Sequence, residues 1–184
     1  MKFTPISIQG AYLIQLSPAA DDRGSFSRLF CNKELETIGH TKNIVQVNHS
    51  ITKQAGTVRG MHFQQAPHSE IKMIRCLRGK VFDVLVDLRE GSATFLQWYG
   101  IELSPAMYQM IYIPKGCAHG FQALENDSEL IYFHSDFYNA ESESAVRFDD
   151  PMLSIKWPLT PVNISERDKN HSLLNKSFSG IEVL

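Results

Sequence analysis

The feature that most constrains the fold is a long run of strand-like segments in the middle of the chain. Each segment is rich in β-branched and aromatic residues, and short breaks at Gly, Pro, Asn and Ser separate them. This pattern predicts an all-β protein with antiparallel strands, either a sandwich or a jelly roll. The expected strands lie within residues 44–50, 56–64, 73–79, 80–89, 95–104, 107–116, 119–125 and 128–138.

Little regular structure is expected outside this run. Residues 32–39 predict one short helix, with Asn32 as its N-cap and Gly39 as its stop. The polar tail after Pro158 is typical of a loop, with a short helical turn in residues 165–170. Because the 184 residues contain no repeat and no linker, we expect a single domain spanning residues 1–184.

Charge and composition argue against several classes of protein. The formal net charge of -2 offers no basic field for nucleic acid. No segment has the roughly 18 uninterrupted apolar residues of a membrane span, and the N-terminus lacks the apolar run of a signal peptide, so we expect a cytoplasmic protein. The three cysteines lie far apart in sequence, which favours buried small side chains over a disulfide or a zinc site.

The last expected strand is apolar on both faces. Strand geometry places Leu130, Tyr132 and His134 on one face, and Ile131 and Phe133 on the other. A strand with one solvated face would not need both sets, so we expect one face toward a cavity and the other against a second sheet or subunit. A homodimer is expected on this ground.

Some polar side chains share strand faces with apolar ones. Lys72 lies on the face of Ile74 and Cys76, either with its stem along an apolar surface and its ammonium in solvent, or with the ammonium inside a cavity. Tyr132 and Tyr138 are either core residues with satisfied hydroxyls or functional phenols. The sequence pattern alone leaves both alternatives open.

Arg59 and His62 lie three residues apart in an expected strand, which places them on opposite faces of a regular strand. Gly60 lies between them, and a glycine inside a strand often marks a bulge. A bulge would turn both side chains toward the same side. We therefore expect the cation and the imidazole to share a cavity.

The spacing Pro114-x-Gly116-x-x-His119 matches the second half-motif of cupin jelly rolls. In metal-binding cupins the first half-motif supplies His-x-His and a carboxylate, but here His62 is followed by Phe63 and Gln64. Too few ligands remain for three protein groups around an ion. We therefore expect a metal-free site.

An imidazole, an amine, phenols and arginines in one β cavity suit proton transfer next to a carbonyl. Histidine is a competent base near neutral pH and a phenol can return a proton. A lysine can stabilise the enolate between these steps, and arginines can hold a phosphorylated substrate. A noncatalytic protein that binds a sugar nucleotide would show a similar set, so these residue types do not separate an enzyme from a binder.

Several runs in the chain together resemble the dTDP-4-dehydrorhamnose 3,5-epimerase family. They extend from D-D-R-G at Asp21 to S-E-R-D ending at Asp168, and they include residues 59–64, 72–89, 91–98, 113–121 and 157–158. The resemblance implies a cupin-type jelly roll without metal or cofactor, usually dimeric, with an N-terminal segment exchanged across the dimer. It also implies epimerisation at C3 and C5 of a nucleotide-linked 4-keto-6-deoxyhexose through an enolate.

The same resemblance implies roles for individual residues. His62 matches the family's base and Asp168 its carboxylate partner, while Tyr132 matches the proton donor and Lys72 the group that faces the enolate. Asp83 is either a residue that supports a cavity histidine or a solvated or structural aspartate. The matched positions that contact sugar, pyrophosphate or base are Arg23, Phe26, Gln46, Asn48, Arg59, His119, Tyr138, Glu143 and Arg167.

One position departs from the family pattern. Arg28 lies in R-G-S-F-S-R, where the family commonly has a glutamate that contacts the nucleotide. A guanidinium only donates hydrogen bonds, whereas the carboxylate accepts them, so Arg28 signals either a different nucleotide or a side chain that points to solvent. The leading expectation is the double epimerase. The alternatives are an epimerase of one carbon or of another nucleotide-sugar, and a noncatalytic sugar-nucleotide-binding cupin.

Overall fold

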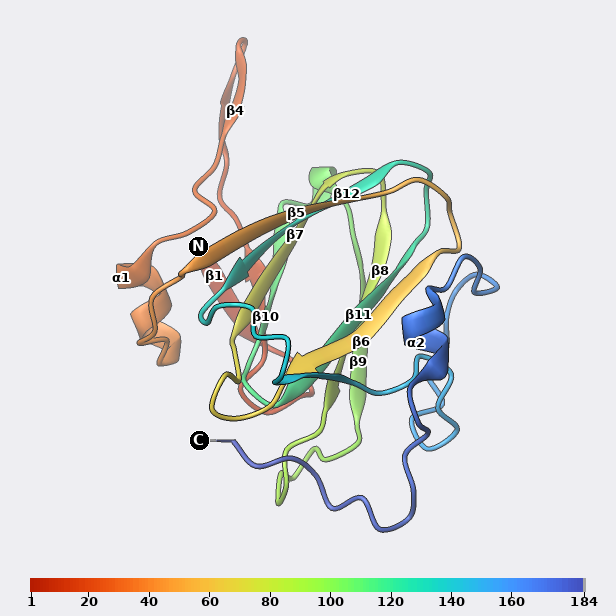
Figure 1. The fold of residues 1–184 in the computed structure, drawn as a ribbon. Coiled ribbons are helices and arrows are strands. Elements are labelled where there is room, and N and C mark those ends of the chain that lie inside the picture. Colours follow the sequence, from red (N-terminus) through yellow and green to blue (C-terminus); the bar gives the residue numbers. More distant parts are fainter. Residues whose placement is uncertain (184) are drawn as a thin grey trace.

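The computed structural model describes residues 1–183, and two antiparallel sheets dominate it (Figure 1). The first has six strands in the order β1-β2-β10-β7-β12-β5, and the second has five in the order β13-β6-β11-β8-β9. The first sheet contains β1 (Lys2–Pro5), β2 (Tyr12–Gln15), β10 (Gln109–Ile113), β7 (Lys72–Arg78), β12 (Ser128–His134) and β5 (Gln46–Thr52). The second contains β13 (Glu143–Ala145), β6 (Val58–Gln64), β11 (Cys117–Ala123), β8 (Val81–Asp87) and β9 (Trp98–Leu103).

The all-β prediction is confirmed, and the chain has the cupin-type jelly-roll fold. Each of the eight expected segments overlaps one strand of β5–β12, and the bounds differ by up to two residues where β5, β7 and β11 extend beyond the expected segment. The sequence pattern did not identify the short strands β1, β2 and β13, nor the hairpin of β3 (Ala19–Asp21) and β4 (Gly24–Phe26). These strands have three or four residues each, too few to show a clear alternation of polar and apolar side chains.

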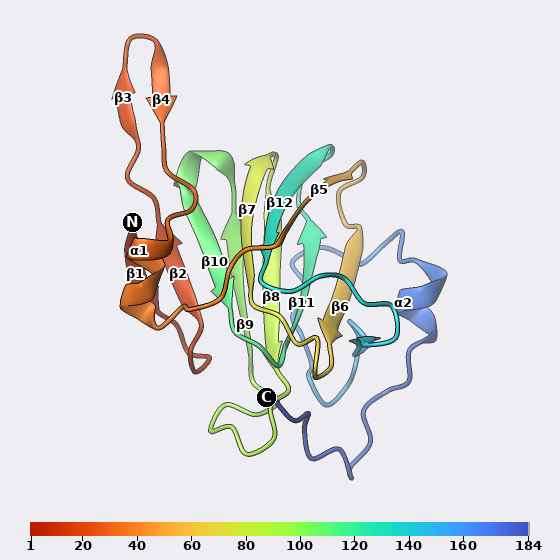
Figure 2. The same ribbon diagram turned by 60° about the vertical axis from the view of Figure 1, so that its left-hand side comes forward.

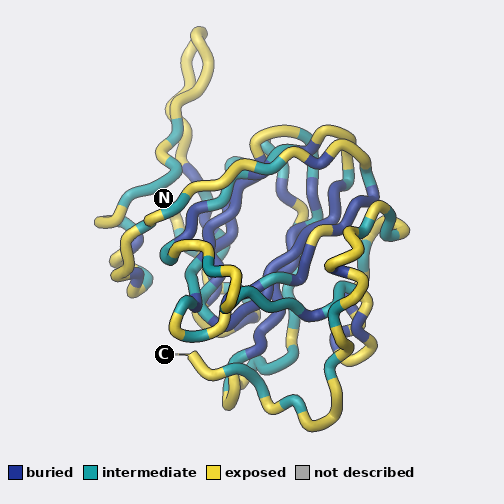
Figure 3. Tube along the Cα trace, viewed as in Figure 1, coloured by how far each residue is buried: buried dark blue, intermediate teal, exposed yellow. Residues whose placement is uncertain are grey.

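The main core lies between the two sheets. Ile74 and Leu130 of the first sheet are fully buried with Leu85 and Phe121 of the second. Burying apolar surface on the inner faces stabilises the sandwich by roughly 25 cal/mol per Å². Figure 3 shows the buried strands as the centre of the molecule. The core fills one part of the space between the sheets and leaves the rest to a cavity.

The outer faces of both sheets are covered by the chain itself. Phe133 of β12 stacks on Phe30 at a ring-centroid distance of 6.4 Å, and Leu35 and Met73 belong to the same buried cluster. One expectation for β12 was a cover made by a second sheet or subunit. Instead, the segment around the first helix of the same chain covers this face, while the opposite face lines the cavity.

Residues 1–183 contain two short α-helices. α1 (Asn32–Leu35) continues into a 3₁₀ turn (Glu36–Ile38) that ends at Gly39 with φ of 79°. The predicted stop is confirmed, but the predicted cap is wrong: Cys31 occupies the N-cap position without a side-chain hydrogen bond, and Asn32 is the first helical residue. The expected helical turn near the C-terminus is confirmed as α2 (Glu166–Asn170).

The β3–β4 hairpin projects away from the sandwich (Figures 1 and 2). All its strand residues are exposed, and Phe26 retains 79% of its accessible surface. Among residues 1–183, no helix is long and apolar enough to cross a membrane.

Candidate active site

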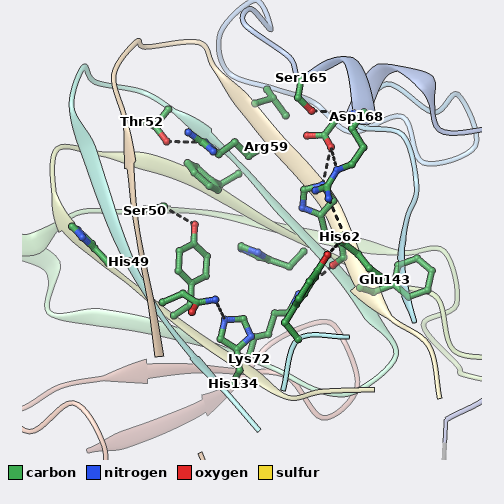
Figure 4. Close-up of a pocket in the computed structure, with 18 of the residues that line it drawn as sticks. His49, Ser50, Thr52, Arg59, His62, Lys72, His134, Glu143, Ser165 and Asp168 are labelled. Atoms are coloured by element: carbon green, nitrogen blue, oxygen red, sulfur yellow. Dashed lines mark hydrogen bonds and ion pairs between the residues drawn. The ribbon is translucent and has the colours of Figure 1, made fainter. Parts of the chain in front are cut away.

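A cavity of about 1110 Å³ opens between the sheets, at the upper end of the range that suits small ligands. Its walls come from β5, β6, β7, β11 and β12, with α2 at one side (Figure 4). The predicted site residues that line it are Gln46, Asn48, Arg59, His62, Lys72, His119, Tyr132, Tyr138, Glu143, Arg167 and Asp168.

A bulge in β6 explains how Arg59 and His62 reach the same cavity. His62 pairs with His119 of β11 and Arg59 pairs with Phe121, so β6 contains one residue more than β11 between these two pairs. Gly60 has φ of 128°, a backbone conformation that favours glycine. The predicted bulge at Gly60 is confirmed.

His62 and Asp168 form a hydrogen-bonded pair, with Nε2 of the ring 2.8 Å from Oδ1 of the carboxylate. Because an ionised carboxylate only accepts, the ring proton lies on Nε2 and the lone pair lies on Nδ1. The second carboxylate oxygen accepts the Gly60 N–H at 3.3 Å. Burial by itself raises the pKa of Asp168, but the hydrogen bond and charge of His62 outweigh it and hold the pKa below its ordinary value.

The local sequence explains how α2 presents Asp168. Ser165 is the N-cap, and its Oγ accepts the Asp168 N–H at 3.1 Å. Asp168 is the third helical residue, so its carboxylate also lies in the first turn, where a negative charge is favourable. The capped turn fixes the carboxylate against β6 while only 4% of its side-chain surface is exposed.

Lys72 and Tyr132 reach the cavity from the six-stranded sheet, opposite the sheet that carries His62. The side chain of Lys72 is 10% exposed, so the alternative in which its ammonium reaches solvent is wrong. The Tyr132 hydroxyl lies 3.0 Å from Ser50 Oγ. Burial raises the pKa of Tyr132 far above its ordinary value, which keeps the phenol protonated at neutral pH.

A second histidine–carboxylate pair lies on the cavity wall. His119 Nε2 is 2.9 Å from Oδ2 of Asp83, and Asp83 is fully buried. The expected contact between Asp83 and a cavity histidine is therefore present. On the neighbouring strand, the Arg59 guanidinium donates to Thr52 Oγ1 at 3.2 Å, which holds its charge along the cavity.

The mouth of the cavity carries a polar network. The Tyr138 hydroxyl and the Arg167 Nη1 both donate to Oε2 of Glu143, each at 2.9 Å. Arg167 also brings Nη2 to 3.2 Å from His62 Nε2. Tyr138 and Arg167 are exposed, so both are accessible to an incoming ligand.

Three predicted binding residues lie outside this cavity within the described chain. Arg23 and Phe26 belong to the projecting hairpin, where Arg23 donates to Asp21. Arg28 follows the hairpin, and its Nη1 donates to Oε1 of Glu34 at 2.6 Å. A single chain therefore brings together the expected groups around the sugar chemistry, but not these three.

Comparison with known proteins agrees with this geometry. The family described as dTDP-4-dehydrorhamnose 3,5-epimerase matches residues 5–176. A dTDP-4-dehydrorhamnose 3,5-epimerase of Sinorhizobium fredii is 39% identical over 187 residues, covering 100% of this chain and 96% of its own. The chain belongs to the dTDP-4-dehydrorhamnose 3,5-epimerase family. It is therefore an isomerase of the epimerase class.

Two solved structures show the same fold. The dTDP-6-deoxy-D-glucose-3,5-epimerase of Legionella pneumophila in complex with dTDP-4-keto-L-rhamnose is similar with a TM-score of 0.92 and 36% identity, covering 100% of this chain and 98% of its own. ChmJ, a 3'-monoepimerase of Streptomyces bikiniensis in complex with dTDP-quinovose, has a TM-score of 0.85 and 32% identity, covering 92% and 86%. The fold is thus shared by double and single epimerases.

The donor set of the epimerase cavity does not form a metal centre. Within residues 1–183, no three His, Cys, Asp or Glu side chains are grouped so that they could hold a metal ion. His62 and His119 each use one ring nitrogen in a hydrogen bond to a carboxylate, that of Asp168 and that of Asp83 respectively. These pairs suit proton transfer and orientation of a ligand.

Several cavity residues of the epimerase were missed by the sequence analysis, among them His134, Glu70 and Ser50. His134 lines the cavity beside Tyr132, and the alternation in residues 128–138 already placed both on one face. Glu70 also lines it, but it lies before β7 in a segment with no periodic pattern. Ser50, the partner of Tyr132, was likewise not identified.

Proposed function

We propose that this epimerase inverts C3 and C5 of dTDP-4-dehydro-6-deoxyglucose to give dTDP-4-dehydro-L-rhamnose. The observation that carries the proposal is the cavity in which an imidazole–carboxylate pair faces an ammonium and a protonated phenol from the opposite sheet. Protons next to the C4 ketone are acidic because their removal gives an enolate. Base, acid and oxyanion stabiliser are the three groups that such a reaction requires.

In the proposed reaction His62 removes the proton from the carbon next to the ketone. Its Nδ1 accepts that proton, and the two electrons of the C–H bond move into the enolate. Asp168 accepts the Nε2–H at 2.8 Å, which orients the ring and stabilises the imidazolium that forms. The enolate oxygen at C4 takes up the negative charge, which Lys72 stabilises from a site with little water.

Tyr132 is proposed to return a proton to the opposite face of the same carbon. It extends from β12 of one sheet, whereas His62 extends from β6 of the other, so the two groups reach the cavity from different sides. Delivery from the face opposite to removal inverts the configuration. The phenol of Tyr132 is protonated at neutral pH, as a proton donor has to be before the step.

The nucleotide part is proposed to lie toward the mouth of the cavity. Arg59 and Arg167 supply positive charge for the pyrophosphate. His119 contacts the sugar, and the other proposed contacts to sugar or nucleotide are Gln46, Asn48, Tyr138 and Glu143.

Arg23 and Phe26 are proposed to reach the nucleotide of a second copy of the chain in a cytoplasmic homodimer. The projecting hairpin supports this arrangement, since its aromatic residue Phe26 is 79% exposed within its own chain. Arg28 is held by Glu34 of the same chain, which supports a role outside base recognition.

The decisive experiment is proton NMR of dTDP-4-dehydro-6-deoxyglucose with the protein in deuterated water, with C3 and C5 followed separately. Exchange at both positions with a changed ring configuration supports the double epimerase. In His62→Ala, exchange should be lost at both carbons while dTDP binding persists; retained exchange would contradict the role of His62. Tyr132→Phe should reduce turnover more than proton removal, because the base survives while the acid is lost.

An epimerase of one carbon is the second candidate, since the 3'-monoepimerase ChmJ shares the fold at 32% identity. Exchange at only one carbon in the same experiment would establish it. A noncatalytic binder would give saturable dTDP binding without exchange at either carbon.

A further inference from the structure

A second cluster of charged side chains lies in the cavity, apart from the His62–Asp168 pair. The Lys72 ammonium is 3.2 Å from Oε1 of Glu70, and His134 Nδ1 is 2.7 Å from Oε2 of the same carboxylate. Glu70 therefore holds one partner on each oxygen. His134 is labelled beside Lys72 in Figure 4, and all three residues line the cavity.

These three side chains are largely buried, so their charges need partners within the protein. The side chains of Glu70, Lys72 and His134 are 8%, 10% and 11% exposed. Charges this far from water are tolerated only when they are paired and hydrogen-bonded. The backbone oxygen of His62 is a further acceptor for Lys72, at 3.4 Å, and it is neutral. Glu70 thus supplies the negative charge that compensates Lys72.

Hydrogen-bond chemistry fixes the orientation of His134. Because the carboxylate accepts, the Nδ1 of His134 donates to Glu70. The Nε2 of the ring then faces Asn48 Nδ2 at 3.4 Å, where the amide donates. The same ring stacks on Tyr132 with an interplanar angle of 23° and a centroid distance of 6.1 Å. His134 therefore links the proposed proton donor to the carboxylate that holds Lys72.

We propose that Glu70 and His134 are positioning residues of the epimerase, with Glu70 keeping Lys72 charged and in place and His134 fixing Glu70. This inference rests on the proposed function, in which Lys72 stabilises the enolate. Neither residue has to touch the substrate, since both act through Lys72.

The surroundings of Lys72 show why it depends on Glu70. β12 contributes His134 and Tyr132 to this corner, and β6 contributes His62, none of which is a permanent anion. β10 places the apolar Ile113 opposite Lys72 in the sheet register. Burial disfavours an unpaired ammonium, whereas a carboxylate within about 4 Å favours it. Without Glu70, the Lys72 ammonium would be buried without a compensating negative charge.

The charge state of Glu70 fits this function. Burial by itself raises the pKa of Glu70, but the hydrogen bond from His134 and the positive charge of Lys72 outweigh it and lower the pKa below its ordinary value. Glu70 is therefore a carboxylate at neutral pH.

The first test is the pH profile of kcat for Glu70→Gln, which keeps the shape of the side chain and removes its charge. The variant should lose about tenfold in kcat at neutral pH with little change in KM. On the alkaline limb of the profile, the activity of the variant should begin to decline at a lower pH than that of the wild type, because the buried ammonium no longer has a carboxylate partner. A loss that is equal at all pH values, or no loss, would overturn the proposal.

A matched control exists on the neighbouring strands. His49 and Glu129 form another histidine–glutamate pair, 3.1 Å apart and more exposed, and Glu129 does not line the cavity. Glu129→Gln should keep the wild-type pH profile. If it reproduced the alkaline change of Glu70→Gln, the effect would not depend on Lys72 and the proposal would fail.

The role of His134 is tested by a pair of substitutions. His134→Asn retains an N–H near the position of Nδ1 and should keep most of the turnover, whereas His134→Ala removes the donor and should shift the alkaline limb as Glu70→Gln does. Equal profiles for the two variants would reject a positioning role for His134.

A direct titration separates failure of this inference from failure of the proposed function. Carbon NMR of protein labelled at lysine, with Lys72 assigned from Lys72→Gln, follows the ammonium without any substrate. An unchanged Lys72 titration in Glu70→Gln overturns the inference even if the wild type epimerises both carbons. A lower midpoint in the variant upholds control of the Lys72 charge by Glu70, even where absent exchange in the wild type rejects the proposed reaction.

Discussion

Gly60 and Gly120 approach so closely between β6 and β11 that a Cβ added to Gly60 would lie 2.5 Å from the Cα of Gly120. The contact is between backbones, so a side chain at Gly60 could not be accommodated by a change of rotamer. The same glycine forms the bulge that lets Arg59 and His62 share the cavity. The composition of the active site thus depends on two residues without side chains.

Gly60→Ala should therefore destabilise the fold and disturb the site. Overpacking and a left-handed backbone together should cost about 3 kcal/mol in the free energy of unfolding, measured by urea denaturation. Gly91→Ala is the matched control: its φ is also positive, at 70°, but nothing lies within 4 Å of the added Cβ. It should cost about 1 kcal/mol. Equal losses for the two variants would show that the close approach to Gly120 does not matter.

Asp168→Asn should lower turnover and change the acid sensitivity of the protein. Turnover should fall about a hundredfold or more, because the amide no longer stabilises the imidazolium of His62. The folded-state pKa of Asp168 lies below its ordinary value of 3.8, so the ionised group stabilises the fold above that pH and this stabilisation is lost as the pH falls through the folded-state pKa.

The stability part of this prediction has a clear measurement. The free energies of unfolding of wild type and Asp168→Asn, measured by urea denaturation, should differ more at pH 7 than below pH 3.8, where the Asp168 charge progressively ceases to favour the folded state. A difference that does not change with pH would mean that the Asp168 charge contributes nothing to folding.

The cysteines should differ in reactivity toward a thiol reagent. Burial raises the pKa of Cys76 to about 11 and that of Cys117 to about 12, and the thiolate is the reactive form. Cys31 is only partly buried. Titration of the folded protein with a disulfide reagent at pH 7.5 should modify Cys31 first and the other two only on unfolding. Fast modification of all three would contradict the buried positions of β7 and β11.

The strands and most of the site were predictable because both follow from local pattern. Segments rich in β-branched and aromatic residues, separated by breaks at Gly, Pro, Asn and Ser, identified β5–β12, and the resemblance in residues 59–64, 72–89 and 113–121 assigned His62 and Lys72. The Gly60 bulge was predictable because a glycine in the interior of a strand weakens the strand and often marks a bulge. These features are encoded within a few neighbouring residues.

Other features depend on contacts between distant segments. Glu70 lies in a non-periodic stretch, and its importance appears only when β7 and β12 pair and bring His134 to it, 64 residues away in sequence. Asn32 is not the helix cap because the helix begins at Asn32 itself and Cys31 occupies the N-cap position, a shift of one residue that residue preferences do not resolve. The role of Glu70 therefore depends on tertiary contacts, whereas the cap differs from the prediction by one residue.

The exposed hairpin leads to a prediction that distinguishes a site completed by Arg23 of a second subunit from a site formed by one chain alone. In the proposed homodimer, Arg23 of each subunit reaches the cavity of the other. His62→Ala therefore impairs the cavity of its own subunit, whereas Arg23→Ala impairs the cavity of the partner subunit. In a mixed dimer of the two variants, one cavity carries both defects. The other has an intact His62 and receives an intact Arg23.

Each variant alone should therefore be inactive or nearly so, whereas an equimolar mixture should recover about a quarter of the wild-type activity, since half of the dimers are mixed and each has one intact site of two. The subunits are unfolded together and refolded before the assay so that they exchange. Mixing His62→Ala with Asp168→Asn is the matched control and should recover nothing, because both residues meet within one chain at 2.8 Å. Absence of recovery in the first mixture would place Arg23 at its own subunit's site or outside catalysis.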